Sequence, residues 1–96
     1  MIRVSGNTLA VDGPMTALTV RELLDQGRPG PGAWVVDLSA VTHADSCGLA
    51  VLLEWLRASR QLGGSLSFVG LPVSLQSLAH LYGIDSLLTA DAAAAA

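Results

Sequence analysis

The chain of 96 residues is long enough for one compact domain and too short for two. Its hydrophobic fraction of 51% excludes a disordered protein, and its charged fraction of 14% lies below the roughly 25% of ordinary soluble domains, which suggests a surface that binds a partner. The net charge is −3 and the five cations are scattered arginines, which argues against nucleic-acid binding. Lysine is absent, which excludes sites that depend on a P-loop lysine or a Schiff-base lysine.

Cysteine content and hydropathy limit the compartment and the cofactors. Cys47 is the only cysteine, which excludes an internal disulfide and a thiolate-rich zinc site within one chain. The first residues contain no apolar run of signal-peptide length, and glycines, Pro72 and serines interrupt the longest uncharged stretch, residues 61–84. We therefore expect a cytoplasmic protein that does not insert into a membrane and holds neither a metal nor another cofactor.

The N-terminal third predicts a hairpin and a helix. Two short β-prone runs, residues 2–4 and 8–11, flank Ser5, Gly6 and Asn7, a pattern typical of a β-hairpin turn. After Pro14, the apolar side of a helix that ends near Gly27 is marked by Leu18, Leu23 and Leu24.

The middle of the chain predicts a buried strand followed by a long helix. Residues 33–38 form a nearly continuous apolar run, which is typical of a central strand buried on both faces. Residues 41–45 are expected to form a loop. The Ser46 hydroxyl is then expected to cap a helix that extends to about Leu62.

The remaining elements complete the fold class. Residues 66–69 predict another strand. A helix is expected after it, ending at Gly83, with apolar positions at Leu75, Leu78, Ala79 and Tyr82. Strands that alternate with helices after an opening hairpin predict an α/β sandwich, with a small mixed β-sheet and helices mainly on one face. We expect residues 1–88 to form this single domain and residues 89–96 an alanine-rich tail.

The long helix has an unusually wide apolar face. One side, expected to contact the sheet, carries Leu49, Leu52, Leu53 and Leu56. A second apolar side carries Gly48, Val51, Trp55 and Leu62. Either Trp55 packs against the following helix at Leu75 and Leu78, or Val51 and Trp55 form an interface with another protein, which the low charge content favours.

Residues 43–48 hold the densest group of chemically active side chains. His43, Asp45 and Cys47 alternate and could bind a metal with His80, but a helix that begins at Ser46 or Cys47 would break the alternation. Ser46 could also act as a nucleophile, with His43 as its base and Asp37 or Asp45 orienting the histidine. The sequence around Ser46 does not contain the Gly-x-Ser-x-Gly motif that is typical of such hydrolases. Cys47 fits a small, partly buried thiol better than a reactive one. We expect neither a metal site nor catalysis.

Ser46 has two remaining interpretations. It is either the helix cap alone or a contact that phosphorylation could switch. The negative charge of a phosphate on Ser46 would be stabilised by the helix N-terminus and repelled by the carboxylate of Asp45. The phosphate would also disrupt an apolar contact with a partner.

Several segments together resemble the STAS domains, the family of anti-sigma factor antagonists. Residues 36–41 and 45–53 resemble the central signature of the family, and the resemblance covers nearly the whole chain, strongest in residues 33–88 and weaker before them. Within the family, the chain resembles most the MlaB-type subunits of bacterial Mla phospholipid ABC transporters, on the segments 45–50, Gly63 and 78–82.

The resemblance implies a non-catalytic subunit that binds and supports the transporter ATPase within a permease complex, at the cytoplasmic side of the inner membrane, in a system for outer-membrane lipid asymmetry. The expected partner-binding residues are His43, Ser46, Cys47, Val51, Trp55 and His80. The alternative is an anti-sigma factor antagonist that captures a kinase-type anti-sigma factor and is released by phosphorylation of Ser46. Cys47, where antagonists commonly carry a second small polar residue, and the short N-terminal sheet weaken this alternative.

Overall fold

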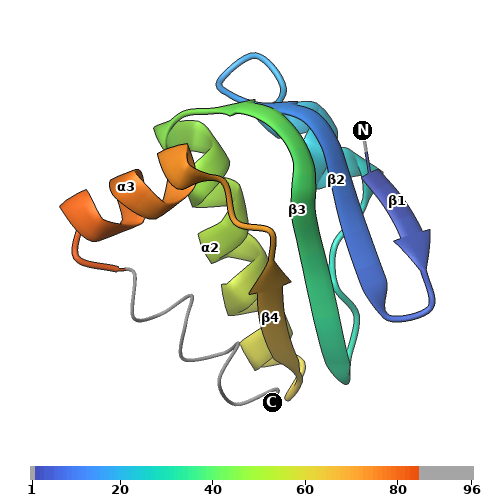
Figure 1. Cartoon of the computed structure of the whole chain (residues 1–96). Helices are drawn as coiled ribbons and strands as arrows, with labels where there is room; N and C mark the ends of the chain where they lie inside the picture. Colours follow the sequence, from blue (N-terminus) through green and yellow to red (C-terminus); the bar gives the residue numbers. More distant parts are fainter. Residues whose placement is uncertain (1, 85–96) are drawn as a thin grey trace.

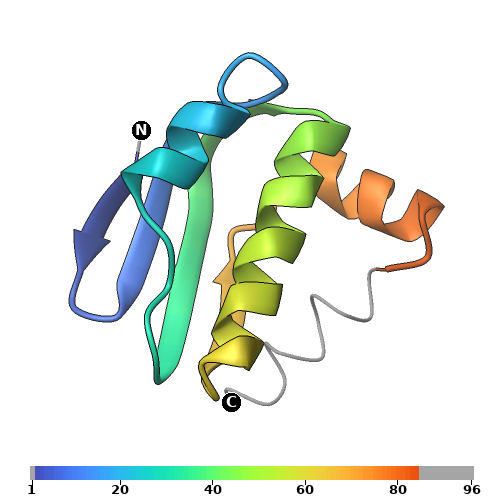
Figure 2. The ribbon, with the colours of Figure 1, turned by 180° about the vertical axis from the view of Figure 1, so that it is seen from behind.

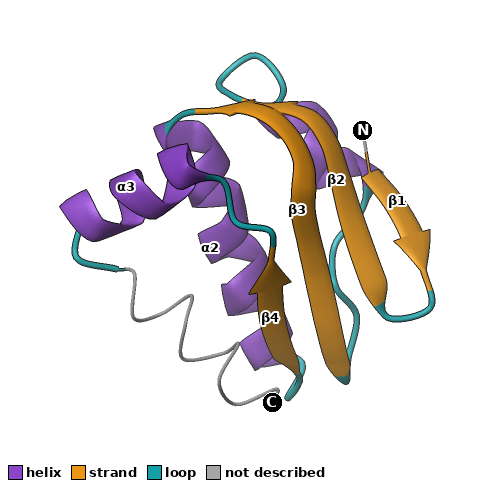
Figure 3. Cartoon of the chain, viewed as in Figure 1, coloured by secondary structure: helices purple, strands orange, loops and turns teal. Residues whose placement is uncertain are grey.

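The computed structural model describes residues 2–84 of the chain. In chain order, the described residues form β1 (Ile2–Ser5), β2 (Thr8–Met15), α1 (Val20–Gln26), β3 (Ala33–Ala44), α2 (Ser46–Gln61), β4 (Ser65–Val69) and α3 (Val73–Leu81). Figure 3 shows these strands and helices by colour. The predicted α/β class is confirmed, whereas the predicted alanine-rich tail, residues 89–96, lies outside the described residues.

The sheet follows the order β1-β2-β3-β4. β1 and β2 are antiparallel and are joined by a two-residue turn in which Gly6 has a φ of 58°, a value that glycine adopts without steric cost. β2 with β3 and β3 with β4 are parallel pairs. The sheet is therefore mixed, as the opening hairpin and the later alternation of strands and helices predicted.

The helices bury one face of this sheet. Figures 1 and 2 show α1 and α2 on the same face, with α3 against α2 at the β4 end of the sheet. Alternate strand residues point into the resulting core, among them Leu9, Val36, Leu38 and Leu66, each with no exposed surface. Within residues 2–84, no helix combines the length and the apolar character needed to cross a membrane.

β3 departs from the prediction in length and in burial. Its last residues, expected as a loop, pair with the end of β2 at Gly13↔Val41 and Met15↔Ala44, and a register shift precedes each of these two pairs. Val36 and Leu38 are buried while Asp37 between them is partly exposed, so the prediction of a strand buried on both faces is wrong. The physical reason is that the helices cover a single face of the sheet.

The first helix begins later than predicted. α1 starts at Val20, and Leu18 lies in the preceding turn with 94% of its surface exposed. That turn is closed by the carbonyl of Thr16, which accepts from the backbone N–H groups of Thr19 and Val20 at 3.0 Å each. Assigning Leu18 to the apolar side of the helix was therefore wrong.

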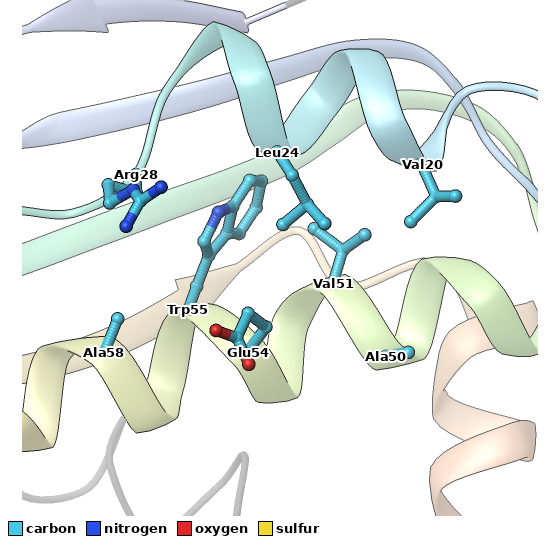
Figure 4. A pocket seen from close by; sticks show the side chains of 8 residues that line it. All are labelled: Val20, Leu24, Arg28, Ala50, Val51, Glu54, Trp55 and Ala58. Carbon is cyan, nitrogen blue, oxygen red and sulfur yellow. The ribbon is translucent and has the colours of Figure 1, made fainter.

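The wide apolar face of α2 is buried within the chain. Val51 and Trp55 are each only 1% exposed, so the expectation that they form an exposed interface is wrong. α2 lies between α1 and α3 on the sheet. Because it packs against both helices as well as the sheet, it buries a wider apolar face than a helix that contacts a sheet alone. Trp55 is packed inside the protein, and the helix that faces its ring in Figure 4 is α1 rather than the predicted last helix.

Candidate partner-binding site

The candidate site lies at the carboxyl ends of the parallel strands β2 and β3. The loop of residues 16–19 leaves β2 there, and α2 begins there directly after β3 (Figure 1). Carboxyl ends of parallel strands bring separate loops to one edge of the sheet, where binding residues gather. Residues far apart in the sequence therefore meet at this edge. Ala17 and Asp45, for example, are 28 residues apart and are joined by a hydrogen bond.

Asp45 fastens these segments together. Its Oδ1 accepts from the backbone N–H groups of Cys47 at 2.8 Å and Gly48 at 3.3 Å, which caps α2. Its Oδ2 accepts from the N–H of Ala17 at 3.2 Å, and its own N–H donates to the carbonyl of Met15 at 3.2 Å. One carboxylate thus holds the β2–α1 loop against the first turn of α2.

Ser46 is not the helix cap. It is the first residue of α2 and is exposed, while the side chain of Asp45 makes the capping hydrogen bonds. The interpretation of Ser46 as a simple N-cap is therefore wrong, because the carboxylate one residue earlier takes both N–H groups. The Ser46 side chain is accordingly accessible for contact or modification.

Gly48 allows α2 to approach β2 closely. A Cβ on this buried residue would lie 2.4 Å from the carbonyl oxygen of Met15, well inside an ordinary contact. The absence of a side chain therefore sets the position of Ser46 relative to the end of β2.

Leu18 lies at the candidate site, and the sequence interpretation missed it. Its neighbour Ala17 is bonded to Asp45, and the Leu18 side chain is 94% exposed beside the start of α2. Thr19 closes the loop by donating from Oγ1 to the carbonyl of Pro14 at 2.9 Å and accepting from the N–H of Thr16 at 3.0 Å. The two threonines that flank Leu18 were the available signal, since threonine hydroxyls commonly close tight turns.

The other predicted site residues are divided between two places. His43 is exposed near the end of β3, and Cys47 is half-buried in the first turn of α2, so both lie at the candidate site. His80 lies in the last turn of α3, and Figures 1 and 2 show this end of α3 directed away from the start of α2. Among the described residues, no group of three or more His, Cys, Asp or Glu side chains is arranged to hold a metal ion.

The geometry around Ser46 does not assemble a catalytic triad. Asp37 precedes His43 by six residues on the same strand, a separation of about 20 Å. The Oδ1 of Asp37 accepts from the hydroxyl and the backbone N–H of Ser39, and these hydrogen bonds lower the pKa of Asp37 below its usual value. The oxygens of Asp45 are occupied by backbone N–H groups. Both candidate partners for His43 are therefore engaged elsewhere.

Comparison with known proteins agrees with this architecture. The family model described as "Mlab, STAS domain" matches residues 2–89. Two curated relatives, from Escherichia coli strain K12 and from Shigella flexneri, are each 28% identical over 83 residues, which covers 85% of this chain and 86% of the relative. Both are named intermembrane phospholipid transport system binding protein MlaB.

Two solved structures share the fold at low identity. A sulfate transporter family protein from Wolinella succinogenes has a TM-score of 0.65 at 19% identity, over 90% of this chain and 75% of that chain. The unphosphorylated anti-sigma factor antagonist SpoIIAA has a TM-score of 0.61 at 11% identity, over 84% of this chain and 81% of that chain. The family match and the names of the two MlaB relatives point to a regulatory or binding role. The chain belongs to the Mlab STAS-domain family.

Proposed function

We propose that this protein is the non-catalytic STAS subunit of a phospholipid ABC transporter, and that it binds and supports the ATPase subunit at the cytoplasmic side of the inner membrane. The observation that carries the proposal is the match to the two MlaB relatives over 85% of this chain and 86% of theirs. A match of this extent supports an equivalent subunit rather than a shared fragment.

The face proposed to contact the ATPase consists of the loop around Leu18 and the start of α2 at Ser46. Leu18 offers an apolar side chain that is 94% exposed, and burial of this side chain against a partner would be favourable. His43 and Cys47 lie at this face, whereas Val51 and Trp55 are buried further along α2. The predicted contribution of His80 would require a partner that also reaches the far end of α3.

The alternative, a phosphorylation switch at Ser46, is favoured by one specific observation. Ser46 is exposed and Asp45 performs the capping, so a phosphate could be added without loss of the cap. The added dianion would lie next to the Asp45 carboxylate, and the repulsion would act on the group that holds the loop of Leu18. A switch of this kind could operate on an ATPase partner or on a kinase-type anti-sigma factor.

Co-purification with the transporter ATPase from the same organism tests the proposal. The tagged chain and the ATPase are expressed together, and the amount of ATPase recovered is measured for the wild type, Leu18→Glu and Ser46→Asp. We expect both variants to recover at least about tenfold less ATPase, because each places a charge in an apolar contact.

Matched controls carry the same changes elsewhere. Leu62→Glu alters an exposed leucine, 51% exposed, at the opposite end of α2, and Ser77→Asp alters an exposed serine on α3. Both controls should recover the ATPase like the wild type. Equal recovery with Leu18→Glu and Leu62→Glu would refute the proposed face, and no recovery with the wild-type chain would refute the proposed function. Phosphate on Ser46 in protein purified from its own cells would support the switch.

A further inference from the structure

A groove separates α1 from α2 on the outer side of the helical layer. Its volume is about 370 Å³, close to the lower limit of small-molecule sites (Figure 4). Both helices contribute apolar walls, formed by Val20, Leu24, Val51 and Ala58. This composition suits a short aliphatic group better than a polar ligand.

The indole of Trp55 places a hydrogen-bond donor in this groove. The residue is 1% exposed, and its Nε1 is buried without a hydrogen-bond partner among the described residues. An indole N–H can only donate, so its burial without an acceptor is unfavourable. Figure 4 shows this nitrogen on the edge of the ring that faces Arg28.

Arg28 supplies a second donor at the same end of the groove. It follows α1, and its guanidinium lies across the groove from α2 in Figure 4. The acidic residue on this side of α2, Glu54, accepts hydrogen bonds from Arg57, whose Nε lies 3.1 Å from Oε2. Two donors thus converge on one end of a largely apolar groove, and Glu54, which also lines the groove, is hydrogen-bonded to Arg57 while it attracts Arg28 electrostatically.

We propose that this groove binds a small aliphatic carboxylate. The hydrocarbon chain lies against Leu24 and Val51, and the carboxylate accepts from Arg28 and, after a small rotation of the indole that uncovers its N–H, from the Nε1 of Trp55. Hydrogen bonds from an arginine to a carboxylate are charge-assisted, and this acceptor satisfies both donors at once. The inference does not depend on the proposed role in a transporter, because it rests on residues away from Leu18 and Ser46.

Nuclear magnetic resonance of the indole N–H groups tests the assignment directly. The chain has two tryptophans, and Trp34 is the internal reference because its Nε1 already donates to the carbonyl of Pro31 at 3.3 Å. Hexanoate should shift the Trp55 indole resonance saturably and leave that of Trp34 in place. Acetate lacks the chain and hexanol lacks the charge, so each should bind at least about tenfold more weakly than hexanoate.

Two variants separate the donors from the apolar walls. Arg28→Gln removes the charge and should reduce hexanoate affinity to that of hexanol, whereas Arg21→Gln, an exposed arginine of α1 outside the groove, should bind hexanoate like the wild type. Trp55→Phe keeps most of the ring and removes the N–H, so calorimetry should show weaker hexanoate binding with hexanol binding unchanged. Thermal unfolding of each variant confirms that it is folded.

Three results would overturn the assignment. Equal affinity for hexanol and hexanoate would mean that the groove is an apolar cavity without a carboxylate site. No shift of the Trp55 resonance at millimolar hexanoate would mean that water alone satisfies the indole. A leucine-terminated tetrapeptide that binds more tightly than hexanoate, and loses affinity on amidation of its C-terminus, would assign the groove to the chain end of a partner protein instead.

Discussion

Replacement of Gly48 by alanine tests how closely α2 must approach the sheet. The new Cβ would lie 2.4 Å from the carbonyl oxygen of Met15 and 3.0 Å from its Cβ, where ordinary contacts begin at 3.4 Å. The obstructing atoms include backbone, so a side-chain rotation cannot relieve the overlap. The first turn of α2 must therefore move away from the end of β2.

The magnitude follows from three opposing contributions. Overpacking of a tight contact costs about 1–3 kcal/mol, and loss of the hydrogen bond from Asp45 to Met15 costs about 1 kcal/mol. Alanine in place of glycine gains at most about 1 kcal/mol in helix propensity. We expect the free energy of unfolding to fall by about 1–3 kcal/mol, and each kcal/mol lowers the melting temperature of a chain of this size by about 4–8 °C.

Urea and thermal unfolding of the wild type, Gly48→Ala and Ala50→Gly measure this effect. Ala50 is exposed two residues further along α2, and its replacement by glycine should cost only the propensity difference of about 1 kcal/mol. Without the close contact, Gly48→Ala would be the more stable protein. A rise in its free energy of unfolding would therefore refute the reasoning, and the same variant should recover less ATPase because Ser46 moves with the helix.

Two further variants test the core and the pH dependence. Trp55→Ala should lower the free energy of unfolding in urea by about 3–5 kcal/mol, while Leu62→Ala, at an exposed position, should change it by less than about 1 kcal/mol; a similar loss in both would contradict the burial of Trp55. Because hydrogen bonds from Ser39 lower the pKa of Asp37 below its usual value, the ionised carboxyl stabilises the folded protein above the usual aspartate pKa, and this contribution is lost as the pH falls through the lowered pKa. The stability difference between the wild type and Asp37→Asn should therefore shrink as the pH falls through the usual aspartate pKa and below it, and a difference that is independent of pH would contradict this role.

The sequence predicted those elements whose signals are local. The two-residue turn at Gly6 and Asn7 and the end of the last helix at Gly83, whose φ is 70°, follow from conformations that few other residues adopt. α2 was predicted nearly to its exact length because its apolar period continues without interruption to a pair of glycines. The family resemblance, carried by the segment around Asp45, was also visible before the structure.

The errors arose where a distant segment decides the outcome. Asp45 and Ser46 both suit the capping position, and the carboxylate prevails because it also accepts from Ala17, 28 residues earlier in the chain. The end of β3 is extended because Ala44 pairs with Met15 of β2, a contact that no periodicity reveals. The interface interpretation of Trp55 was favoured over packing inside the chain because no local pattern in the sequence measures how closely α1 covers this residue.

The strand order also has a consequence for how the chain folds. Each strand pairs with its immediate successor in sequence, so the spatial order of the sheet repeats the order of synthesis. β1 and β2 can form a hairpin as soon as both have left the ribosome, and each later strand adds to an edge that already exists, before the next has been made. In this order of assembly, each new strand pairs with a strand that is near in sequence. Short separations of this kind favour rapid folding, and rapid folding limits the time during which an unpaired edge is exposed to other chains.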